Sequence, residues 1–515
     1  MNDRPGTQEP PGSLYAFSDI THRLCRVSCI RICKIRFWVA AAKGDLAFCA
    51  VLSLELRETQ YLYDIQVSGS WACIQGFRSS DATLFIYISR IPSDYRMYQR
   101  RGRGSGNSRG RGRGIVTVSD PSIEQPVPRD IDEGLLPGVL RTLSRPRDVF
   151  NREVSITNLE YLGSYNWVDE AHPTIIVPGS PPIWKHRPLP YQVQADRGIA
   201  FIDQNGYRLP SSCLLPLFKA VDVVAEDNAD VDIDWPSVDF VTDRNGLRKL
   251  MRWLDDTGDG DRPREFRIDL QLGGKGTVLM SRWQEKTWEP AGFSFGFSFE
   301  KASTKAAARC ERSTGHHRIV QYDFDGLKMV VRFEVDACIE TLAPHPSSRT
   351  GDVDDLASQL SGLSVSSTSS RAAANTSSTS DVDILRGGRQ VPQSSIIELT
   401  TRSERNAATF DWKEQYPQLY LSQTIHHFLA IHQRGYFTRI EKRKLSDNQM
   451  NDIHARAEES FKKLRALLGT IQDLVIGHGQ RGRLSLLCQN GELQVRERES
   501  QDSFLPDEVM KRFDF

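Results

Sequence analysis

The chain has 515 residues, and its 66 Lys and Arg residues balance 66 Asp and Glu residues, so the formal net charge is zero. This balance excludes a uniformly basic nucleic-acid binder and a strongly acidic chain as descriptions of the whole protein. Nine cysteines in this length are too few for a disulfide scaffold, which favours reduced thiols in a cytosolic or nuclear protein. By length we expect about two to four domains, or fewer if long segments are disordered.

Residues 1–96 mix apolar and basic side chains without a helical or strand period. The most apolar stretch, from Phe37 to Leu56, is interrupted by three charged residues, so we expect no transmembrane span. The first residues lack the layout of a signal peptide. We therefore expect residues 1–96 to be a poorly structured N-terminal extension, with Met97 as a candidate alternative start.

Two segments have the composition of disordered chain. Residues 100–114 (RRGRGSGNSRGRGRG) alternate Arg with Gly, and we expect residues 97–145 to be disordered. Such a tail can contact RNA through its arginines or act only as a solubilising linker. Residues 345–394 are rich in Ser and Thr and are predicted to be a disordered insertion. The folded domain is then expected in two parts, residues 146–344 and 395–515.

Three local patterns predict individual elements. The acidic run at residues 222–239 is predicted to be a solvated loop. A helix is predicted from Asp447 to about Ile476, with Ser446 as its cap and Gly477 at its end, because apolar residues recur every three to four positions. Asn490-Gly491 between two apolar runs predicts a β-hairpin.

Four short segments place acidic residues in runs typical of β-strands. They are residues 237–244, 296–300, 328–336 and 395–400. Glu334 and Asp336 are two positions apart, so strand alternation would put both carboxylates on one face. Like charges held together are costly unless a cation joins them, which indicates a divalent metal, the alternative being a half-exposed amphipathic strand. Glu398 lies in an apolar run and needs a partner if it is buried. We expect the last two segments to form strands of one sheet.

The order of these segments resembles the DXO-type decapping exoribonuclease family, whose core is a PD-(D/E)XK nuclease fold. The resemblance covers about residues 150–344 and 395–498. The matching segments are DFVTDRNGLRKL with Arg244, GFSFE at 296–300, GHHRIV at 315–320, FEVDAC at 333–338, IELTTRS at 397–403 and LSQT with Gln423. Their number and order carry the resemblance, because no single motif is specific.

The resemblance implies an α+β fold with a mixed central β-sheet and flanking helices. It implies one or two divalent ions, Mg²⁺ or Mn²⁺, with oxygen ligands from Glu300, Glu334, Asp336, Glu398 and the Leu399 carbonyl. Glu334, Asp336 and Glu398 would be the catalytic residues. Such ions activate water and stabilise charge on an attacked phosphodiester.

The resemblance also assigns substrate contacts. Arg244 and Gln423 would hold the RNA 5′ end or the scissile phosphate, because the planar guanidinium donates two parallel hydrogen bonds. Thr400 occupies the substrate-side position where the family has a lysine that contacts the phosphate. A threonine supplies no positive charge there, so we expect weakened hydrolysis, with Lys413 and Arg402 as candidates for the missing charge.

The implied function is metal-dependent decapping (pyrophosphohydrolase) and 5′–3′ exoribonuclease activity in mRNA quality control. The implied substrates are RNA 5′ ends with an incomplete or NAD-type cap, a 5′–3′ exoribonuclease is the implied partner, and no membrane is involved. The implied location is the nucleus, with the cytoplasm as a second possibility. The main alternative is a catalytically inactive module of the same fold that binds RNA 5′ ends.

A remote alternative comes from Asp255–Asp259, which spells the DDxxD motif of prenyl diphosphate synthases. Those enzymes are all-α and carry the motif on a helix. Gly258 and Gly260 disfavour a helix here, and the sequence holds no second DDxxD. A solvated acidic turn is the favoured interpretation.

Overall fold

The computed structural model describes residues 126–147, 151–228, 233–256, 265–340, 382–479 and 483–514 with their side chains, and only the backbone of short strands between residues 32 and 116. The chain divides into two units, Met1–Asn107 and Ser108–Phe515. Among the described helices, none is long and apolar enough to span a membrane.

The first unit contains two small antiparallel sheets. Its described strands are β1 (Ile32–Ala42), β2 (Asp45–Leu54), β3 (Tyr63–Val67), β4 (Ser70–Ile74), β5 (Gly76–Phe77) and β6 (Leu84–Tyr87). They pair in the order β1-β2-β6-β5 and as the hairpin β3-β4. These strands differ from the poorly structured extension that we expected for residues 1–96, whose other residues lie outside the described part, as does the Arg-Gly tract at 100–114.

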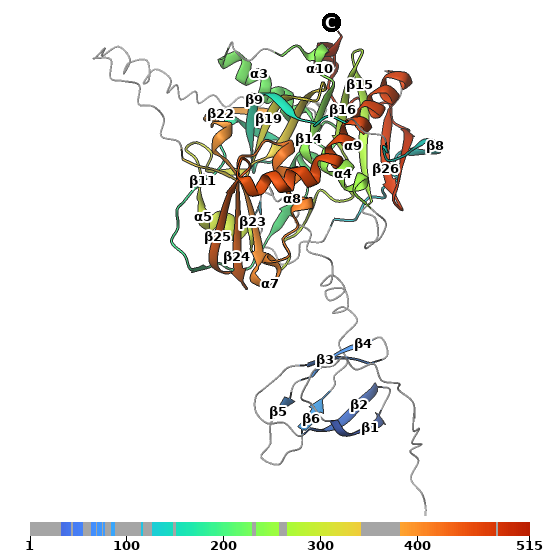
Figure 1. Cartoon of the computed structure of the whole chain (residues 1–515), viewed down its shortest axis with the longest axis vertical. Coiled ribbons are helices and arrows are strands. Elements are labelled where there is room, and N and C mark those ends of the chain that lie inside the picture. Colours follow the sequence, from blue (N-terminus) through green and yellow to red (C-terminus); the bar gives the residue numbers. More distant parts are fainter. Residues whose placement is uncertain are drawn as a thin grey trace, which may run out of the picture. The chain divides into compact units, whose positions relative to one another are not determined.

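The second unit is built on an 11-stranded mixed sheet (Figure 1). In spatial order its strands are β22 (Asp383–Gly388), β10 (Thr174–Gly179), β9 (Ile156–Val168), β19 (Ser313–Phe324), β20 (Lys328–Glu334), β14 (Phe240–Asp243), β16 (Thr277–Arg282), β15 (Phe266–Gly273), β26 (Leu484–Gln489), β27 (Glu492–Arg498) and β8 (Leu135–Leu143). The sheet is mixed because β14 pairs in parallel with β16 and β20, whereas β19 and β20 are antiparallel.

A second mixed sheet of seven strands lies in the same unit. Its strands in order are β12 (Tyr191–Gln192), β25 (Tyr436–Lys444), β24 (His426–Gln433), β23 (Ile396–Ser403), β21 (Ala337–Cys338), β11 (Ile183–Trp184) and β18 (Thr304–Lys305). A three-stranded sheet joins β17 (Trp288–Pro290), β13 (Ile199–Phe201) and β7 (Ile115–Val116).

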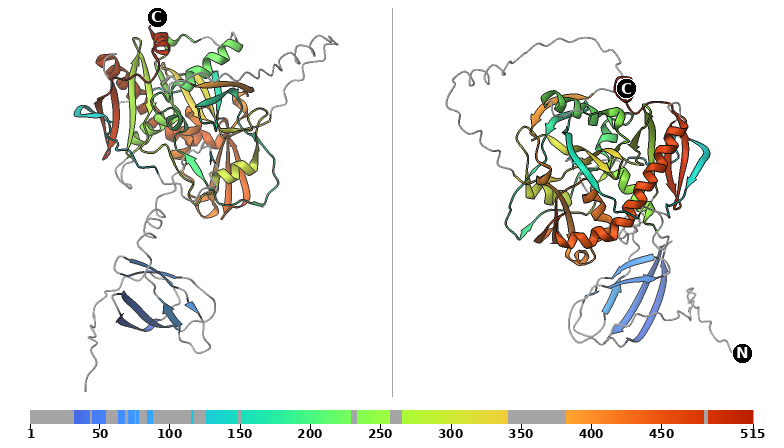
Figure 2. Two further views of the ribbon diagram at one scale, coloured as in Figure 1. Left: turned by 180° about the vertical axis from the view of Figure 1, so that it is seen from behind. Right: turned by 45° about the horizontal axis from the view of Figure 1, so that its top comes forward.

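Helices cover both faces of the large sheet. The described α-helices are α2 (Gln204–Arg208), α3 (Leu215–Asp227), α4 (Arg244–Leu254), α5 (Gly296–Ser303), α7 (Glu404–Ala407), α8 (Trp412–Leu421), α9 (Asn448–His478) and α10 (Asp507–Met510). The long helix α9, orange-red in Figure 1, packs against α4 and α8. Helix α3, green in Figures 1 and 2, packs on β9 and β10.

Each face of the large sheet packs into its own hydrophobic core. Adjacent residues of β14 show the division: Phe240 and Val241 are both fully buried, but Phe240 belongs to the core under α4 and α9, and Val241 belongs to the core under α3. This is the alternation that strand geometry imposes when both faces are covered. The sheet therefore serves as a buried scaffold that holds the loops at its strand ends.

The α+β class with mixed sheets and flanking helices is confirmed, and so are the two most regular elements. Helix α9 spans Asn448–His478, so it begins one residue later and ends two residues later than expected. Asp447, not Ser446, is its cap residue, and Gly479 with φ 84° ends it instead of Gly477. The hairpin β26–β27 turns at Asn490-Gly491, where both residues have positive φ (51° and 82°).

Other expectations differ from the structure. The acidic run begins inside α3, and only residues 229–232 lie outside the described part, so residues 222–227 are helix and not a loop. The apolar residues of α3 are buried against β9, and this burial stabilises the helix although its acidic residues are exposed. The folded region also begins earlier than residue 146, because β8 pairs with β27. Residues 345–381 of the Ser/Thr-rich tract lie outside the described part. The end of the tract, which we also expected to be disordered, contains strand β22, and this strand pairs with β10.

The two acidic strand segments that we placed in one sheet lie in two sheets. Strand β20 ends at Glu334 in the large sheet, and β23 belongs to the smaller one. The chain crosses between the sheets at Val335 and Asp336, and β21 then pairs antiparallel with β23. The crossover could not be inferred from alternation, because the run 328–338 has no break in its apolar pattern.

Candidate active site

The expected site residues come from three different parts of the fold. Glu300 lies on α5, Glu334 is the last residue of β20, Asp336 lies in the crossover between the two sheets, and Glu398 lies in β23. The first residue of α4, Arg244, reaches the same region. These elements are brought together where the large sheet passes into the smaller one.

The segment 296–300 forms a helix and not the strand that we expected. Asp196 explains the difference. Its carboxylate accepts hydrogen bonds from the backbone amides of Ser298 (2.9 Å) and Phe297 (3.4 Å), which are in the first turn of α5. A side-chain oxygen at this position satisfies amides that have no partner within the helix. The signal is 100 residues away along the chain, so local sequence reasoning missed it.

Asp336 is the most constrained carboxylate of the site. Its Oδ2 accepts a 2.7 Å hydrogen bond from the Leu399 amide, while its buried Oδ1 has no hydrogen-bond partner among the described residues. Burial raises the pKa of Asp336 well above its usual range, and the charges of Glu398 and Glu300 raise it further. Three carboxylates therefore act on one another in a buried space, where repulsion is expensive.

Glu398 is buried and has two partners. Arg244 Nη1 lies 3.4 Å from its Oε2, and Gln418 of α8 donates a hydrogen bond to its Oε1. Arg244 also donates to Ser422 Oγ at 3.3 Å, which fixes the guanidinium between β23 and the end of α8. The positive charge of Arg244 thus acts on the carboxylates of both Asp336 and Glu398.

Glu334 has a different contact. It is half-buried, and its Oε1 lies 3.5 Å from Nε2 of His317, its partner across the β19–β20 ladder. The expectation that Glu334 and Asp336 share a strand face does not hold as stated, because the strand ends at Glu334 and Asp336 lies in the crossover. The role of Glu334 as an ion ligand stays a prediction.

Thr400 lies on the same strand face as Glu398, two residues further along β23. Its Oγ1 is 3.1 Å from His427 Nε2. Burial, with smaller contributions from Arg443 and Arg402, lowers the pKa of His427 to about 3, so this ring is neutral near pH 7. The contact to Thr400 therefore supplies no positive charge.

The two candidates for the missing charge lie in different surroundings. Lys413 is exposed and lies beside Asp255, with Nζ 3.4 Å from the carbonyl oxygen and 4.0 Å from the carboxylate. Arg402 is half-buried on β23, its guanidinium 5.4 Å from the centre of the Phe410 ring. Arg402 shares the strand face of Glu398 and Thr400, so it is the better placed of the two.

The expected glutamine is not the one that reaches the carboxylates. Gln423 lies beyond the end of α8 with φ 49°, and its side chain donates back to the Tyr420 carbonyl at 2.7 Å. Gln418 sits one turn earlier on the helix, is fully buried and contacts Glu398, while its Oε1 has no hydrogen-bond partner among the described residues. The local sequence does not indicate Gln418, because its contact with Glu398 forms only in the folded protein.

A row of arginines holds α4 against α8. Arg248 donates to Glu414 at 2.9 Å, and Arg252 Nε donates to the same carboxylate at 2.8 Å. Burial lowers the pKa of Arg248 to about 9, and the nearby Arg252 contributes to this shift. The shared pairing with Glu414 sets the rotation of α4 and thereby aims its first residue, Arg244, at Glu398.

The donor types of these residues suit a divalent cation, although no three of their carboxylates bring ligand atoms within 4.8 Å of one another in the part of the chain that the structure describes. The Oδ1 of Asp336 is a buried oxygen without a partner, its carboxyl group is crowded by Glu300 and Glu398, and hard oxygen donors are the ligands that Mg²⁺, Mn²⁺ and Ca²⁺ prefer. Glu300 and Glu334 are half-buried, whereas Asp336 and Glu398 are buried. Leu399 contributes its amide to Asp336, and a role for its carbonyl stays a prediction.

The prenyl diphosphate synthase alternative is excluded by the fold, which is built on mixed sheets. Asp255 follows the last residue of α4 and accepts a hydrogen bond from Ser460, and Asp256 lies 3.5 Å from Arg145. Both aspartates are thus engaged in structural contacts, and Asp259 lies outside the described residues.

Fold and site together define a class: an α+β protein in which the buried carboxylates of Asp336 and Glu398 lie beside Arg244 at the junction of two mixed sheets. A sequence profile with the description "Domain of unknown function (DUF8563)" matches residues 139–513, so the chain belongs to this family. No curated protein sequence matches the chain.

Several solved structures are similar to the chain, at low identity. Rai1 from S. pombe in complex with 3′-FADP is 13% identical, with a TM-score of 0.44, and the match covers 69% of this chain and 99% of that one. Rai1 from Scheffersomyces stipitis with (3′-NADP)⁺ and calcium is 11% identical, with a TM-score of 0.46 and coverage of 73% and 99%. Candida albicans Rai1 with pU5 and Mn²⁺ is 12% identical, with a TM-score of 0.43 and coverage of 72% and 99%. Because the sequence identities and TM-scores are this low, the function of this chain has to be argued from its own residues.

Proposed function

We propose that this protein is a metal-dependent hydrolase that acts at the 5′ end of RNA. The observation that carries the proposal is the buried, unpartnered Oδ1 of Asp336 beside the carboxylates of Glu300 and Glu398. A fold keeps like charges together in a buried place at a cost in stability, and such groups concentrate at functional sites. The choice of RNA rests on the motif resemblance to decapping exoribonucleases.

Glu300, Asp336 and Glu398, with Glu334 and the Leu399 carbonyl, are the groups that would hold one or two divalent ions. When bound, such ions activate water and stabilise the charge that develops on phosphate oxygens. Arg244 balances part of the negative charge of Glu398, and Gln418 fixes the orientation of that carboxylate. The amide of Leu399 holds Asp336 with Oδ1 turned away from the backbone of β23.

The proposal extends to substrate and setting. The resemblance favours 5′-triphosphate, incompletely capped and NAD-type capped RNA as substrates in mRNA quality control. It also favours a nuclear location and a 5′–3′ exoribonuclease as partner. The carboxylates themselves need no particular cap, because they would act on the phosphates that all these ends share.

A second candidate function is recognition of RNA 5′ ends without turnover. Thr400 favours it, because its hydroxyl faces a neutral His427 at the position where the decapping family has a lysine. Loss of one preorganised positive donor commonly lowers the rate of such reactions by about 10²–10³-fold. Arg244 could then serve as an anion contact in a binding site that has lost most of its catalytic rate.

One experiment separates the two functions. Full-length protein is incubated with 5′-triphosphate, unmethylated-cap and NAD-capped RNA, each with Mg²⁺ or Mn²⁺, and products are resolved by mass. Metal-dependent release of a 5′ fragment from at least one RNA supports the hydrolase. Retained RNA binding without product from any of them supports the binding module, and absence of both binding and product contradicts the two functions together.

A further inference from the structure

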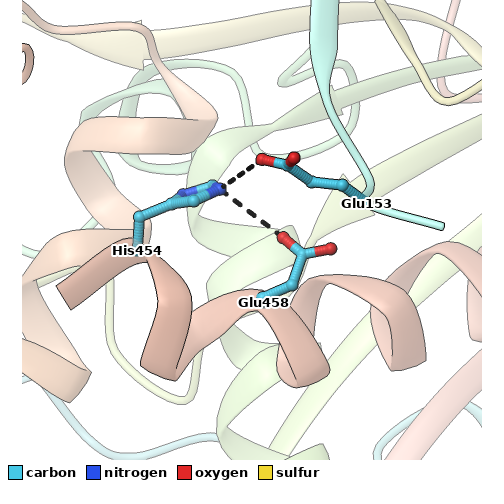
Figure 3. A group of neighbouring side chains, drawn as sticks. All are labelled: Glu153, His454 and Glu458. Carbon is cyan, nitrogen blue, oxygen red and sulfur yellow. Dashed lines mark ion pairs between the residues drawn. The ribbon is translucent and has the colours of Figure 1, made fainter. Parts of the chain in front are cut away.

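A second group of metal-ligating side chains lies outside the candidate active site. Glu153 precedes β9, and His454 and Glu458 lie one turn apart on α9. Figure 3 shows the imidazole pointing between the two carboxylates, with His454 Nε2 3.4 Å from Glu153 Oε1 and 3.5 Å from Glu458 Oε2. One ligand atom of each residue lies within 4.8 Å of the other two.

These separations do not suit direct hydrogen bonds. A hydrogen bond between nitrogen and oxygen is about 2.7–3.2 Å long, and both contacts exceed that range. By contrast, two atoms that each lie about 2.0–2.2 Å from a tetrahedral zinc ion are about 3.3–3.6 Å apart. The measured separations of 3.4 and 3.5 Å fall within the second range.

The surroundings leave one ligand atom free on Glu458. Its Oε1 accepts a 2.8 Å hydrogen bond from the Val154 amide and lies 3.7 Å from Lys462 Nζ. Its Oε2 is buried and has no hydrogen-bond partner among the described residues. One oxygen is thus held by the protein, and the other points at the imidazole, an arrangement that suits a monodentate ligand.

Neighbouring side chains also hold the imidazole of His454 in a fixed orientation. Its Nδ1 is 3.0 Å from the hydroxyl of Tyr416 on α8, and its ring packs against the rings of Tyr420 and Phe461. In the tautomer in which Nδ1–H donates to the hydroxyl, Nε2 keeps a lone pair that faces the carboxylates. Metal-bound histidines characteristically give their other ring N–H to such an outer partner.

We propose that Glu153, His454 and Glu458 form a binding site for one borderline divalent cation such as Zn²⁺. One nitrogen and two oxygen ligands suit this ion and leave a fourth position to water. The ion would tie the segment before β9 to α9 and, through Tyr416, to α8. It would therefore stabilise the helix that carries Gln418, at a site separate from Asp336.

The test measures zinc stoichiometry and affinity by competition with a chromophoric chelator. Full-length protein carries Asp336→Asn as a common background, so that ions at the candidate active site are weakened. We expect one equivalent of Zn²⁺ and a rise in Tm on zinc addition. Glu153→Gln and His454→Gln should each weaken zinc affinity by at least about 10–100-fold, because loss of even an outer partner of a metal ligand commonly costs that much. Glu153 is 71% exposed, so its variant should fold normally.

Glu459→Gln is the matched control. It removes an exposed carboxylate on the same helix that pairs with Lys463, and it should leave zinc affinity unchanged. The proposal is overturned if the background protein takes up no zinc. It is equally overturned if Glu153→Gln and His454→Gln bind zinc like the background protein. Neither result depends on RNA hydrolysis.

Discussion

Arg244 and Glu398 face each other at 3.4 Å with both side chains buried, although 154 residues separate them in sequence. Arg244 begins α4 at the end of β14 in the large sheet, and Glu398 lies in β23 of the smaller one. The pair therefore joins the two sheets at the point where the carboxylates gather. It also sets the charge of the site, because Arg244 lowers the pKa of Asp336 against the effects of burial and of Glu398 and Glu300.

The first prediction concerns this pair. Arg244→Ala should lower the free energy of unfolding by about 3–5 kcal/mol in metal-free protein, because it leaves the buried Glu398 without its counter-charge. Denaturant unfolding in EDTA measures the loss. The double variant Arg244→Ala/Glu398→Gln should recover at least half of it. Additive losses in the double variant would show that the two residues do not interact.

The second prediction concerns pH. The pKa of Asp336 is raised in the folded protein above its ordinary value of 3.8, so the folded state holds a proton that the unfolded state has released. Stability from this group is complete below about pH 3.8 and is lost as the pH rises through the folded pKa. Metal-free wild-type protein should therefore lose stability through this window with a slope of up to about 1.4 kcal/mol per pH unit from this group.

Asp336→Asn provides the comparison for that slope, because an amide does not titrate. The difference between the two unfolding free energies should grow with pH in EDTA and shrink when Mn²⁺ is added, since the ion takes the place of the proton. Unfolding free energies that depend on pH in the same way in both proteins would mean that the pKa of Asp336 is not raised in the folded state.

The third prediction distinguishes the two glutamines. Gln418→Ala should weaken Mn²⁺ binding by about tenfold, because Gln418 orients Glu398 and outer partners of ligands commonly contribute this much. Gln423→Ala removes only a hydrogen bond to the Tyr420 carbonyl and should leave Mn²⁺ affinity unchanged. Calorimetric titration of both variants checks this. A larger effect of Gln423→Ala would show that Gln423, the residue indicated by the motif, supports the site and that Gln418 does not.

The fourth prediction concerns Thr400. Thr400→Lys should raise the rate of RNA 5′-end hydrolysis by about 10²-fold, because it places a cation two residues from Glu398 on the same strand face. Thr400→Val is the control, since it also breaks the contact to His427 without adding charge. Equal rates for the two variants, with Mn²⁺ bound in both, would contradict our account of the departure from the decapping motif.

Much of this site could be predicted from sequence, and the failures have physical causes. The resemblance grouped Glu300, Asp336 and Glu398, and the charges of Glu300 and Glu398 do act on Asp336, while their role as metal ligands stays a prediction. The helix at 296–300 was missed because its cap, Asp196, is distant in sequence. Gln418 was missed because a buried glutamine inside a helix leaves no local pattern, and its contact forms only when α8 packs on β23.

The fold, too, could be predicted only where the signal is local in sequence. The long periodic helix α9 and the Asn490-Gly491 hairpin were predictable because their signals are local. The crossover at Asp336 was not, because a strand that ends and a strand that continues share one apolar pattern. Similarly, the pairing of β8 with β27 joins segments that are distant in sequence, so neither shows the other in its own residues.

The most direct test of the central claim is the initial rate of 5′-fragment release from triphosphate RNA as a function of Mn²⁺ concentration. The comparison is between wild-type protein and Asp336→Asn, with folding checked by circular dichroism. We predict a rate that saturates with Mn²⁺, vanishes in EDTA and falls by at least about 10³-fold in the variant. A rate that is the same in EDTA, or the same in Asp336→Asn, would contradict a carboxylate-centred metal site as the catalytic centre.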